Sequence, residues 1–437
     1  MKQMLNREKQ LAILARTDPG LAGAPIVFVS YGAGHAAALA PVAMSLAAEG
    51  LPVVCIGLTT ASTVFLRYGI EVVRMQDLVG FAAHYKAAAR LGKRLRGAVQ
   101  GHGAIDALET DVYMGVGFLA LVRQLGLRQA RVDFARRGRQ GFCPTEFFAE
   151  VWRHCSPGVV VATSAPRSER AALEAARGCG IARMCVVDLF APYEVQWCAA
   201  TGFADVICVL TEEVAQHFRA HGVPAAALKA TGNPSFDRLA TVDQVRLRHT
   251  FRARRGLAAD VKVLGLISQE ELLKHPFNAL QGDPSLPARL DAAIAGYFGG
   301  GAVHVVIRFH PNETREKRDF GPQVSYSAAS ENLDELLCGV DCVLTSGSTV
   351  GLEAAMLGKP VVQFLGSMFS ADLPLASMEL AAGCERMEEI GPVVDHILAS
   401  GQPPGKAVDA LRKQVGVAVQ NVANEIRVMY LNSENRE

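Results

Sequence analysis

The sequence has no excess of charge of either sign. Its 437 residues include 44 Lys and Arg against 43 Asp and Glu, which gives a formal net charge of +1. Because nucleic-acid binding draws much of its affinity from neutralised phosphates, this balance argues against a nucleic-acid partner. Aromatic residues are also few, at 7%, but hydrophobic residues make up 50% of the chain, so a disordered protein is excluded.

Long apolar runs are absent as well. No window reaches the roughly 18 uninterrupted apolar residues of a transmembrane helix. The N-terminal stretch mixes charges into its short apolar run, unlike a signal peptide. None of the ten cysteines forms a C-x-x-C pair, and several, such as Cys55 and Cys208, lie within apolar runs. We therefore expect buried thiols in a reduced, cytoplasmic protein.

Metal-binding patterns are also lacking. His217 and His221 have a helical i, i+4 spacing, but no HExxH glutamate accompanies them, which favours a surface helix over a zinc site. No D-x-D motif is present to anchor a divalent cation to a diphosphate. The sequence therefore predicts chemistry without a metal or a resident cofactor.

Short β-branched runs alternate with longer Ala/Leu/Glu/Arg stretches through most of the chain. The expected strands are Ile26–Ser30, Val53–Ile56, Val159–Ala162, Met184–Val187, Val206–Leu210, Val263–Ile267, Val303–Phe309, Cys342–Leu344 and Val361–Phe364. The expected helices are Ala36–Ala48, Glu169–Ala176, Glu212–His221, Ala288–Tyr297 and Val350–Met356. This alternation predicts an α/β protein with parallel sheets covered on both faces.

The length corresponds to two or three domains. Strong turn residues at Gly232–Asp237 and a charged stretch to Asp260 mark a boundary. We expect an N-terminal Rossmann-like domain over residues 1–240 and a second one over 241–403. The last segment, 404–437, contains one long amphipathic helix at Ala407–Leu431, predicted to pack back on the N-terminal domain.

The first motif that carries chemistry follows strand Ile26–Ser30 and opens a helix. Gly32, Gly34 and Ala37 satisfy the G-x-G-x-x-[GA] pattern of dinucleotide-binding proteins, but no acidic residue follows the second strand. An NAD-binding oxidoreductase is therefore a less favoured alternative. His35, in the first helical turn, is a candidate proton acceptor because the helix dipole disfavours its charged form.

The second motif, Thr345–Pro360, follows strand Cys342–Leu344. Ser346, Gly347, Ser348 and Thr349 place small hydroxyl residues and a glycine at a helix start, where backbone N–H groups bind phosphate oxygens. Glu353 lies about one and a half turns further on. A carboxylate there is placed to reach the hydroxyls of a ribose whose phosphates rest on the helix start.

The third motif is Arg308-Phe309-His310-Pro311, at the end of strand Val303–Phe309. Ligands of open α/β sheets bind outside the carboxyl ends of strands. Arg308 and His310 are donors suited to a phosphate or a base carbonyl. The second and third motifs should therefore meet at the same edge of one sheet.

These motifs together resemble the GT-B glycosyltransferase superfamily, whose two Rossmann-like domains face each other across a cleft. Gly34-His35 match the Gly-His pair of plant-type UDP-sugar transferases, whose His is the base on the acceptor hydroxyl. Gly347, Glu353, Gly358 and Pro360 match the spacing of their second-domain signature. The resemblance implies that Glu353 binds the ribose.

The sequence motifs resemble more closely those of bacterial surface-polysaccharide enzymes such as capsule and Kdo transferases. Their His-Pro and Ser-rich elements, which contact the nucleotide phosphate, look like His310-Pro311 and Ser346/Ser348/Thr349. The resemblance implies a CMP- or UDP-linked sugar donor, a glycan or lipid-linked acceptor, and a place peripheral to the inner membrane. His35, or otherwise a carboxylate such as Asp188 or Asp111, would be the base.

UDP-N-acetylglucosamine 2-epimerases share this fold and contain three elements that look like segments of this chain. These segments are Gly358-Lys359-Pro360-Val361, His310-Pro311-Asn312 and Gly232-Asn233-Pro234. Their first loop, Gly-Thr-Arg-Pro-Glu, is replaced here by Tyr31–His35. The expectation is therefore a metal-independent glycosyltransferase, with a sugar-nucleotide 2-epimerase or hydrolase as the alternative.

Overall fold

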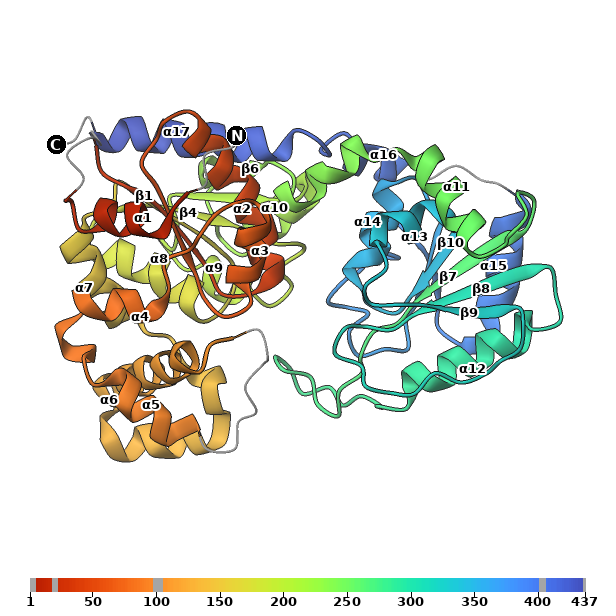
Figure 1. The fold of residues 1–437 in the computed structure, drawn as a ribbon, viewed down its shortest axis with the longest axis horizontal. Coiled ribbons are helices and arrows are strands. Elements are labelled where there is room, and N and C mark those ends of the chain that lie inside the picture. Colours follow the sequence, from red (N-terminus) through yellow and green to blue (C-terminus); the bar gives the residue numbers. More distant parts are fainter. Residues whose placement is uncertain (1–4, 18–22, 97–104, 401–405, 435–437) are drawn as a thin grey trace. The chain divides into compact units, whose positions relative to one another are not determined.

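The computed structural model describes residues 5–17, 23–96, 105–400 and 406–434. The chain forms two compact units, unit 1 (Met1–Asp237 and Val417–Glu437) and unit 2 (Arg238–Gly416). Each unit contains one six-stranded parallel sheet surrounded by helices (Figure 1). The predicted α/β class with two parallel sheets is confirmed.

The sheet of unit 1 is fully parallel and has the strand order β2-β1-β3-β4-β5-β6. Its strands are β1 (Ile26–Ser30), β2 (Val53–Gly57), β3 (Val159–Thr163), β4 (Ala182–Val186), β5 (Val206–Val209) and β6 (Leu228–Ala230). The order reverses at β1, so the topological switch point lies between β1 and β3. Ligands of such sheets bind at this crevice, outside the carboxyl ends of the strands.

The helices of unit 1 cover both faces of that sheet. They are α1 (Arg7–Leu14), α2 (Ala33–Ala48), α3 (Ala61–Arg67), α4 (Met75–Leu78), α5 (Ala88–Arg96), α6 (Ala107–Arg137), α7 (Thr145–Cys155), α8 (Ser168–Gly178), α9 (Val195–Cys198), α10 (Glu212–Ala220) and α17 (Ala418–Glu434). One core joins Phe28 of the sheet to Leu39 of α2 and Ile426 of α17, all fully buried. The last helix is thus an integral part of the first sheet's packing.

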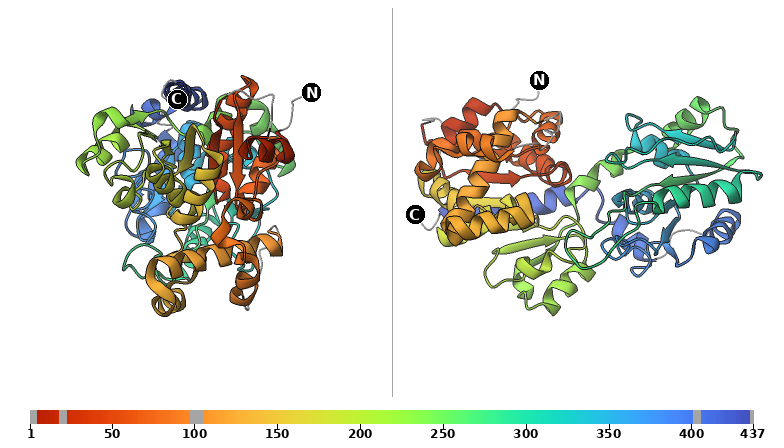
Figure 2. Two further views of the ribbon diagram at one scale, coloured as in Figure 1. Left: turned by 90° about the vertical axis from the view of Figure 1, so that its left-hand side faces the viewer. Right: turned by 90° about the horizontal axis from the view of Figure 1, so that it is seen from below.

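Helices α5 and α6 form a pair inserted between β2 and β3, at the lower edge of unit 1 in Figure 1. Figure 2 shows the same two helices side by side from other directions. A Cβ atom on Gly92 would overlap the Asp111 carbonyl, and one on Gly115 would overlap that of Ala88. The two helix backbones therefore touch, which only glycine permits.

The sheet of unit 2 is also parallel, with the order β12-β11-β10-β7-β8-β9. Its strands are β7 (Lys262–Ile267), β8 (Val303–Arg308), β9 (Val324–Ser327), β10 (Cys342–Thr345), β11 (Val361–Phe364) and β12 (Ala382–Cys384). The order reverses at β7, which places the switch point between β7 and β10. The second and third sequence motifs follow β10 and β8, the two neighbours of β7.

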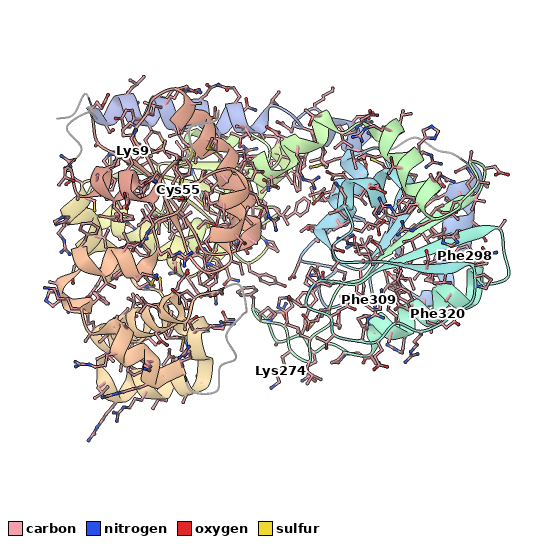
Figure 3. The ribbon with its side chains drawn as sticks, in the orientation of Figure 1. Lys9, Cys55, Lys274, Phe298, Phe309 and Phe320 are labelled. Atoms are coloured by element: carbon pink, nitrogen blue, oxygen red, sulfur yellow. The ribbon has the colours of Figure 1, made fainter. Side chains whose placement is uncertain are left out.

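The helices of unit 2 pack on this sheet around a second core. They are α11 (Gln244–Arg254), α12 (Leu286–Phe298), α13 (Leu333–Gly339), α14 (Thr349–Met356), α15 (Met387–Ser400) and α16 (Lys406–Arg412). Buried Leu290 of α12 and Ile390 of α15 contact the core that includes Ile307 of β8. Figure 3 labels Phe298 of α12, which belongs to the same core.

The prediction of one long helix at Ala407–Leu431 is wrong. The segment forms two helices, α16 in unit 2 and α17 in unit 1, separated by a break at residues 413–417. Gly416 has a φ of 92°, a left-handed conformation incompatible with a continuing helix. The expected boundary between residues 403 and 404 lies outside the described residues.

All ten cysteines are free, and eight of them are buried. Cys55 of β2, labelled in Figure 3, is fully buried, and burial raises the pKa of its thiol.

Within the described ranges, none of the helices combines the length and apolar character required to cross a membrane.

Candidate functional site

The turn after β1 brings His35 to the carboxyl edge of the unit 1 sheet. Helix α2 begins at Ala33, with Gly32 as its N-cap in an extended conformation. Gly34 is exposed in the first turn and has open space around its Cα. His35 follows it, with 28% of its side chain exposed. The space beside Gly34 is therefore open at this edge, and the His35 side chain is partly exposed there.

Asp188, which follows β4, lies next to His35. Oδ2 of Asp188 is 3.8 Å from Nδ1 of His35, a buried atom with no hydrogen-bond partner in the described structure. Asn233 fixes Asp188 because its Nδ2 donates to the Asp188 carbonyl and, at 3.3 Å, to Oδ1. The sequence offered His35 and Asp188 as competing bases, but the fold brings them together as one pair.

Two further carboxyl groups lie around this pair, one buried (Glu169) and one half-buried (Glu194). Glu169, in the first turn of α8, is fully buried and accepts the Tyr31 N–H at 2.6 Å through Oε1, while Oε2 has no hydrogen-bond partner among the described residues. Burial raises the pKa of Glu169, and nearby His35 opposes the shift. Burial also raises the pKa of Glu194, an effect that Asp188 reinforces and His35 opposes. Carboxyl groups with raised pKa values are suited to holding and moving protons.

The loops around His35 are tied to one another. Thr59, after β2, donates its hydroxyl to the Tyr31 carbonyl at 2.5 Å and its N–H to Glu109 at 2.5 Å. The Tyr31 ring contacts Tyr113 of α6, with ring centroids 5.2 Å apart, and the Arg167 guanidinium lies 4.5 Å from its centre. Asp111, the other suggested base, is paired with Arg96 at 3.1 Å.

In unit 2 the turn after β10 has the geometry of an anion-binding helix start. Ser348 is the N-cap of α14 and accepts the Val350 N–H at 3.3 Å, while its own N–H donates to Thr345 Oγ1 at 3.1 Å. A Cβ atom on Gly347 would lie 3.0 Å from the Phe369 carbonyl oxygen. Ser346 is buried and Thr349 is exposed as the first helical residue. The first N–H groups of a helix have no partner within the helix, and those that side chains do not bind, unlike the N–H groups of Ser348 and Val350, are the donors that this turn would offer to an anion.

Glu353, further along α14, faces a cation rather than bulk water. It forms an ion pair with Arg238, which also pairs with Asp334. Burial raises the pKa of Glu353, and Arg238 opposes this shift. A ribose at Glu353 would therefore have to share or displace the Arg238 guanidinium.

Arg308 ends β8 with its guanidinium committed to protein acceptors. It donates to Ser327 Oγ and the Glu331 carbonyl at 3.0 Å, and to the Ala329 carbonyl at 3.2 Å. These contacts hold the end of β9 and the following loop. The immediate role of Arg308 is to shape the edge of the sheet.

His310 retains a donor at the same edge. Its Nδ1 accepts the Asn312 N–H at 3.2 Å, which fixes the neutral tautomer with its proton on Nε2. Glu313 organises the turn by accepting the His310 N–H at 3.3 Å and the Ser268 hydroxyl at 2.6 Å. Arg315 pairs with Glu313 and lies 3.9 Å from the centre of the Phe309 ring, which Figure 3 labels.

A pocket of about 440 Å³ opens at this edge between the loops that follow β7 and β11. Glu271, Gly282, Gly366 and Ser367 contribute to its lining. A larger cavity of about 730 Å³ lies in unit 1, but at the amino ends of β3 and β4, opposite to His35. Because α/β sheets bind ligands at the carboxyl edge, the smaller pocket is the better candidate.

Four residues of these sites were not predicted from the sequence: Glu169, Glu194, Asn233 and Arg238. Glu169 was assigned only to a helix. The Gly232-Asn233-Pro234 element was assigned to a turn at a domain boundary and to the resemblance with UDP-N-acetylglucosamine 2-epimerases. Its position directly after β6 puts Asn233 at the carboxyl edge of the sheet.

Solved structures of similar fold exist, although no family model and no curated protein matches the sequence. UDP-GlcNAc 2-epimerase from Neisseria meningitidis, bound to UDP-GlcNAc, has a TM-score of 0.55 and 12% identity, covering 93% of this chain and 100% of its own. The S. aureus MnaA–UDP structure has a TM-score of 0.58 and 13% identity, covering 94% and 97%.

Glycosyltransferases are among the similar structures too. The calicheamicin glycosyltransferase CalG4 has a TM-score of 0.53 and 14% identity, covering 94% of this chain and 98% of its own. The chain therefore has the two-domain GT-B fold that these glycosyltransferases and UDP-GlcNAc 2-epimerases share.

Proposed function

We propose that the protein is a metal-independent glycosyltransferase that uses a nucleotide-sugar donor. The observation that carries the proposal is the His35–Asp188 pair at the carboxyl edge of unit 1, with Nδ1 of His35 3.8 Å from Oδ2 of Asp188. On the GT-B fold this edge is where an acceptor would bind. Asp188 favours the tautomer with its proton on Nδ1, so Nε2 can accept a proton from the acceptor hydroxyl.

In this proposal unit 2 holds the donor nucleotide. Ser346, Gly347, Ser348 and Thr349 would bind phosphate at the start of α14, and Nε2–H of His310 would donate to the same group. The leaving nucleotide gains negative charge as the glycosidic bond breaks, and fixed N–H and O–H donors stabilise that charge. Glu353 would bind the ribose after exchanging its contact with Arg238. The neighbours that contain UDP or UDP-GlcNAc favour a uridine donor, and a CMP-linked sugar is the other option.

A second candidate, a sugar-nucleotide 2-epimerase or hydrolase, has its own support. Such an enzyme needs groups that both remove and supply protons. The buried carboxyl group of Glu169 and the half-buried one of Glu194, both near His35 and Asp188, provide more proton carriers than a single transfer to an acceptor needs. The dinucleotide-binding alternative lacks comparable support, because β2 ends at Gly57 with Leu58 and Thr59 following, not a carboxylate.

The discriminating assay measures nucleotide release from UDP- and CMP-linked sugars with and without a panel of glycan and lipid-linked acceptors. Release only in the presence of an acceptor supports the transferase. Release without an acceptor, or incorporation of deuterium from D₂O at the sugar C2, supports the second candidate.

The same assay tests the assigned base. We expect His35→Asn to lower kcat about 10²–10⁴-fold without changing nucleotide affinity, as for loss of a general base. His84→Asn is the matched control, since His84 is an exposed histidine of unit 1 paired with Glu150. Equal rates for the two variants would exclude His35 as the base.

Nucleotide binding is tested separately by thermal shift with UMP, UDP, CMP and CDP. A nucleotide at about 100 times its Kd stabilises the protein by roughly 2.7 kcal/mol. We expect Glu353→Ala to reduce that shift and Glu388→Ala, an exposed glutamate in the first turn of α15, to leave it unchanged. An undiminished shift in the Glu353 variant would contradict the ribose assignment.

A further inference from the structure

The inserted helix pair α5–α6 carries a concentration of positive charge that the proposed function does not use. Residues 86–140 contain eleven Lys and Arg against four Asp and Glu, in a chain whose net charge is +1. Three of those four acids form ion pairs: buried Glu109 with Arg74, buried Asp111 with Arg96, and Asp133 with Arg137 at 2.5 Å. The insertion is therefore much more basic than the rest of the protein.

Most of these cations form no ion pair with any residue that the structure describes. Arg96, Arg123 and Arg137 form ion pairs. The cations that are exposed and form no ion pair within the described ranges are Lys86, Arg90, Lys93, Arg94, Arg128, Arg131, Arg136 and Arg139. Most of these side chains belong to α5 or α6, and the two helices touch backbone to backbone at Gly92 and Gly115.

A break within α6 adds exposed aliphatic side chains to this basic insertion. Gly126 has a φ of 75° and a ψ of 159°, so α6 bends there, and every residue from 123 to 129 is exposed. Leu125, Leu127 and Val132 are 38%, 49% and 60% exposed. Aliphatic side chains surrounded by arginines are costly in water but suited to the boundary between lipid head groups and acyl chains.

We propose that the α5–α6 insertion is a docking surface for an anionic lipid bilayer. Its arginines and lysines contact the negatively charged head groups, and Leu125 and Leu127 enter the boundary with the acyl chains. A single-stranded nucleic acid fits less well, because the exposed large hydrophobic residues of the insertion are aliphatic and offer no ring for base stacking.

The docking surface is connected to the candidate site by α6 itself. Tyr113 of α6 contacts Tyr31 beside His35, with ring centroids 5.2 Å apart, and Gly126 lies about 20 Å further along the same helix at 1.5 Å per residue. We infer that the acceptor is carried by a lipid in the same bilayer, and this step alone rests on the proposed function.

Co-sedimentation with vesicles tests the docking surface, with no nucleotide sugar present. We expect the protein to bind vesicles of phosphatidylcholine with 30% phosphatidylglycerol but not vesicles of pure phosphatidylcholine. It should dissociate from the anionic vesicles at about 0.5 M salt. Each basic residue near an anionic membrane is worth about fivefold in partitioning, so Arg128→Gln/Arg131→Gln should bind roughly thirtyfold more weakly. Lys9→Gln/Arg67→Gln removes two exposed cations elsewhere in unit 1 and should bind like the wild type.

Leu125→Gln/Leu127→Gln, which leaves the charge unchanged, should also weaken vesicle binding. Circular dichroism of each variant confirms that it is folded. Equal binding to neutral and anionic vesicles, full binding by either α6 variant, or a preference for a single-stranded RNA over vesicles would overturn the proposal. Because the assay contains no substrate, failure here leaves the proposed function intact, and failure of the activity assay leaves the docking surface intact.

Discussion

His35 and Asp188 come from turns after two different strands, β1 and β4, and neither turn alone defines a site. Their relation depends on Asn233, a 2% exposed residue after β6 that donates to both the carbonyl and the carboxylate of Asp188. In the proposed function, chemistry at His35 would therefore depend on Asn233 as a positioning residue that takes no part in the proton transfer.

Replacing that residue should impair turnover without affecting binding. We expect Asn233→Ala to lower kcat about tenfold to a hundredfold, because a displacement of about 1 Å at a catalytic group has that effect. KM for the donor should change little, and the pH profile should shift because Asp188 no longer faces Nδ1 of His35. Steady-state kinetics across pH check both; a uniform loss at all pH values would show only a structural role.

Buried Glu169 gives a prediction about pH and stability. Burial raises the pKa of Glu169 in the folded protein, so this carboxyl group loses its proton less readily in the folded than in the unfolded state. The folded protein therefore has its full stability below the ordinary pKa of about 4.3 and becomes less stable as pH rises through the folded pKa. Glu169→Gln removes the ionisable group. We expect the variant to be about as stable as the wild type near pH 4 and more stable near pH 8, measured by urea unfolding. A pH-independent difference would contradict this reading.

The strands found from the sequence are the ones that are buried along most of their length. Strands Ile26–Ser30 and Val361–Phe364 were predicted with their observed bounds, since each is a continuous apolar run. The strands that were missed, β6, β9 and β12, lie toward the edges of the sheets, have three or four residues and are partly exposed. Such short edge strands form by hydrogen bonding to a neighbouring strand that is already in the sheet, so they do not require a long apolar run that the sequence would show.

The α5–α6 pair provides a test at the same scale. We expect Gly92→Ala to destabilise unit 1 by about 2 kcal/mol or more, because the new Cβ would overlap the Asp111 carbonyl and force the helices apart. Gly178→Ala at the end of α8 is the control, since its Cβ meets nothing within 4 Å, and it should be neutral or slightly stabilising. Thermal unfolding of both variants decides; similar melting temperatures would show that the helices are not in backbone contact.

At the scale of the whole molecule, the chain ends on the unit where it began. Helix α17 buries Val422, Ile426, Met429 and Tyr430 in the core of unit 1, and Asp237 accepts the N–H groups of Ala418 at 3.2 Å and Val419 at 2.7 Å. In Figure 1 this helix runs along the top of unit 1. Unit 1 is thus assembled from two ends of the sequence.

Removing this helix should unfold unit 1. Four large apolar side chains contribute on the order of 8 kcal/mol, comparable to the whole stability of a domain. We expect a chain ending at Gly416 to lose the slow hydrogen exchange of β1–β4 while unit 2 keeps its own. Protection of β1–β4 equal to that of the full chain would show that α17 is dispensable.

The sequence by itself determined the two parallel sheets and the turns at their carboxyl edges, because apolar runs and glycine-rich or hydroxyl-rich turns are local signals. The resemblance of a few short motifs then predicted the GT-B fold. Only the tertiary structure decided that His35 and Asp188 are partners, that Arg238 pairs with Glu353, and that α5 and α6 touch at Gly92 and Gly115. Each of these relations joins residues of different elements, and a pattern read along one dimension cannot show which groups meet once the strands are ordered and the helices are packed.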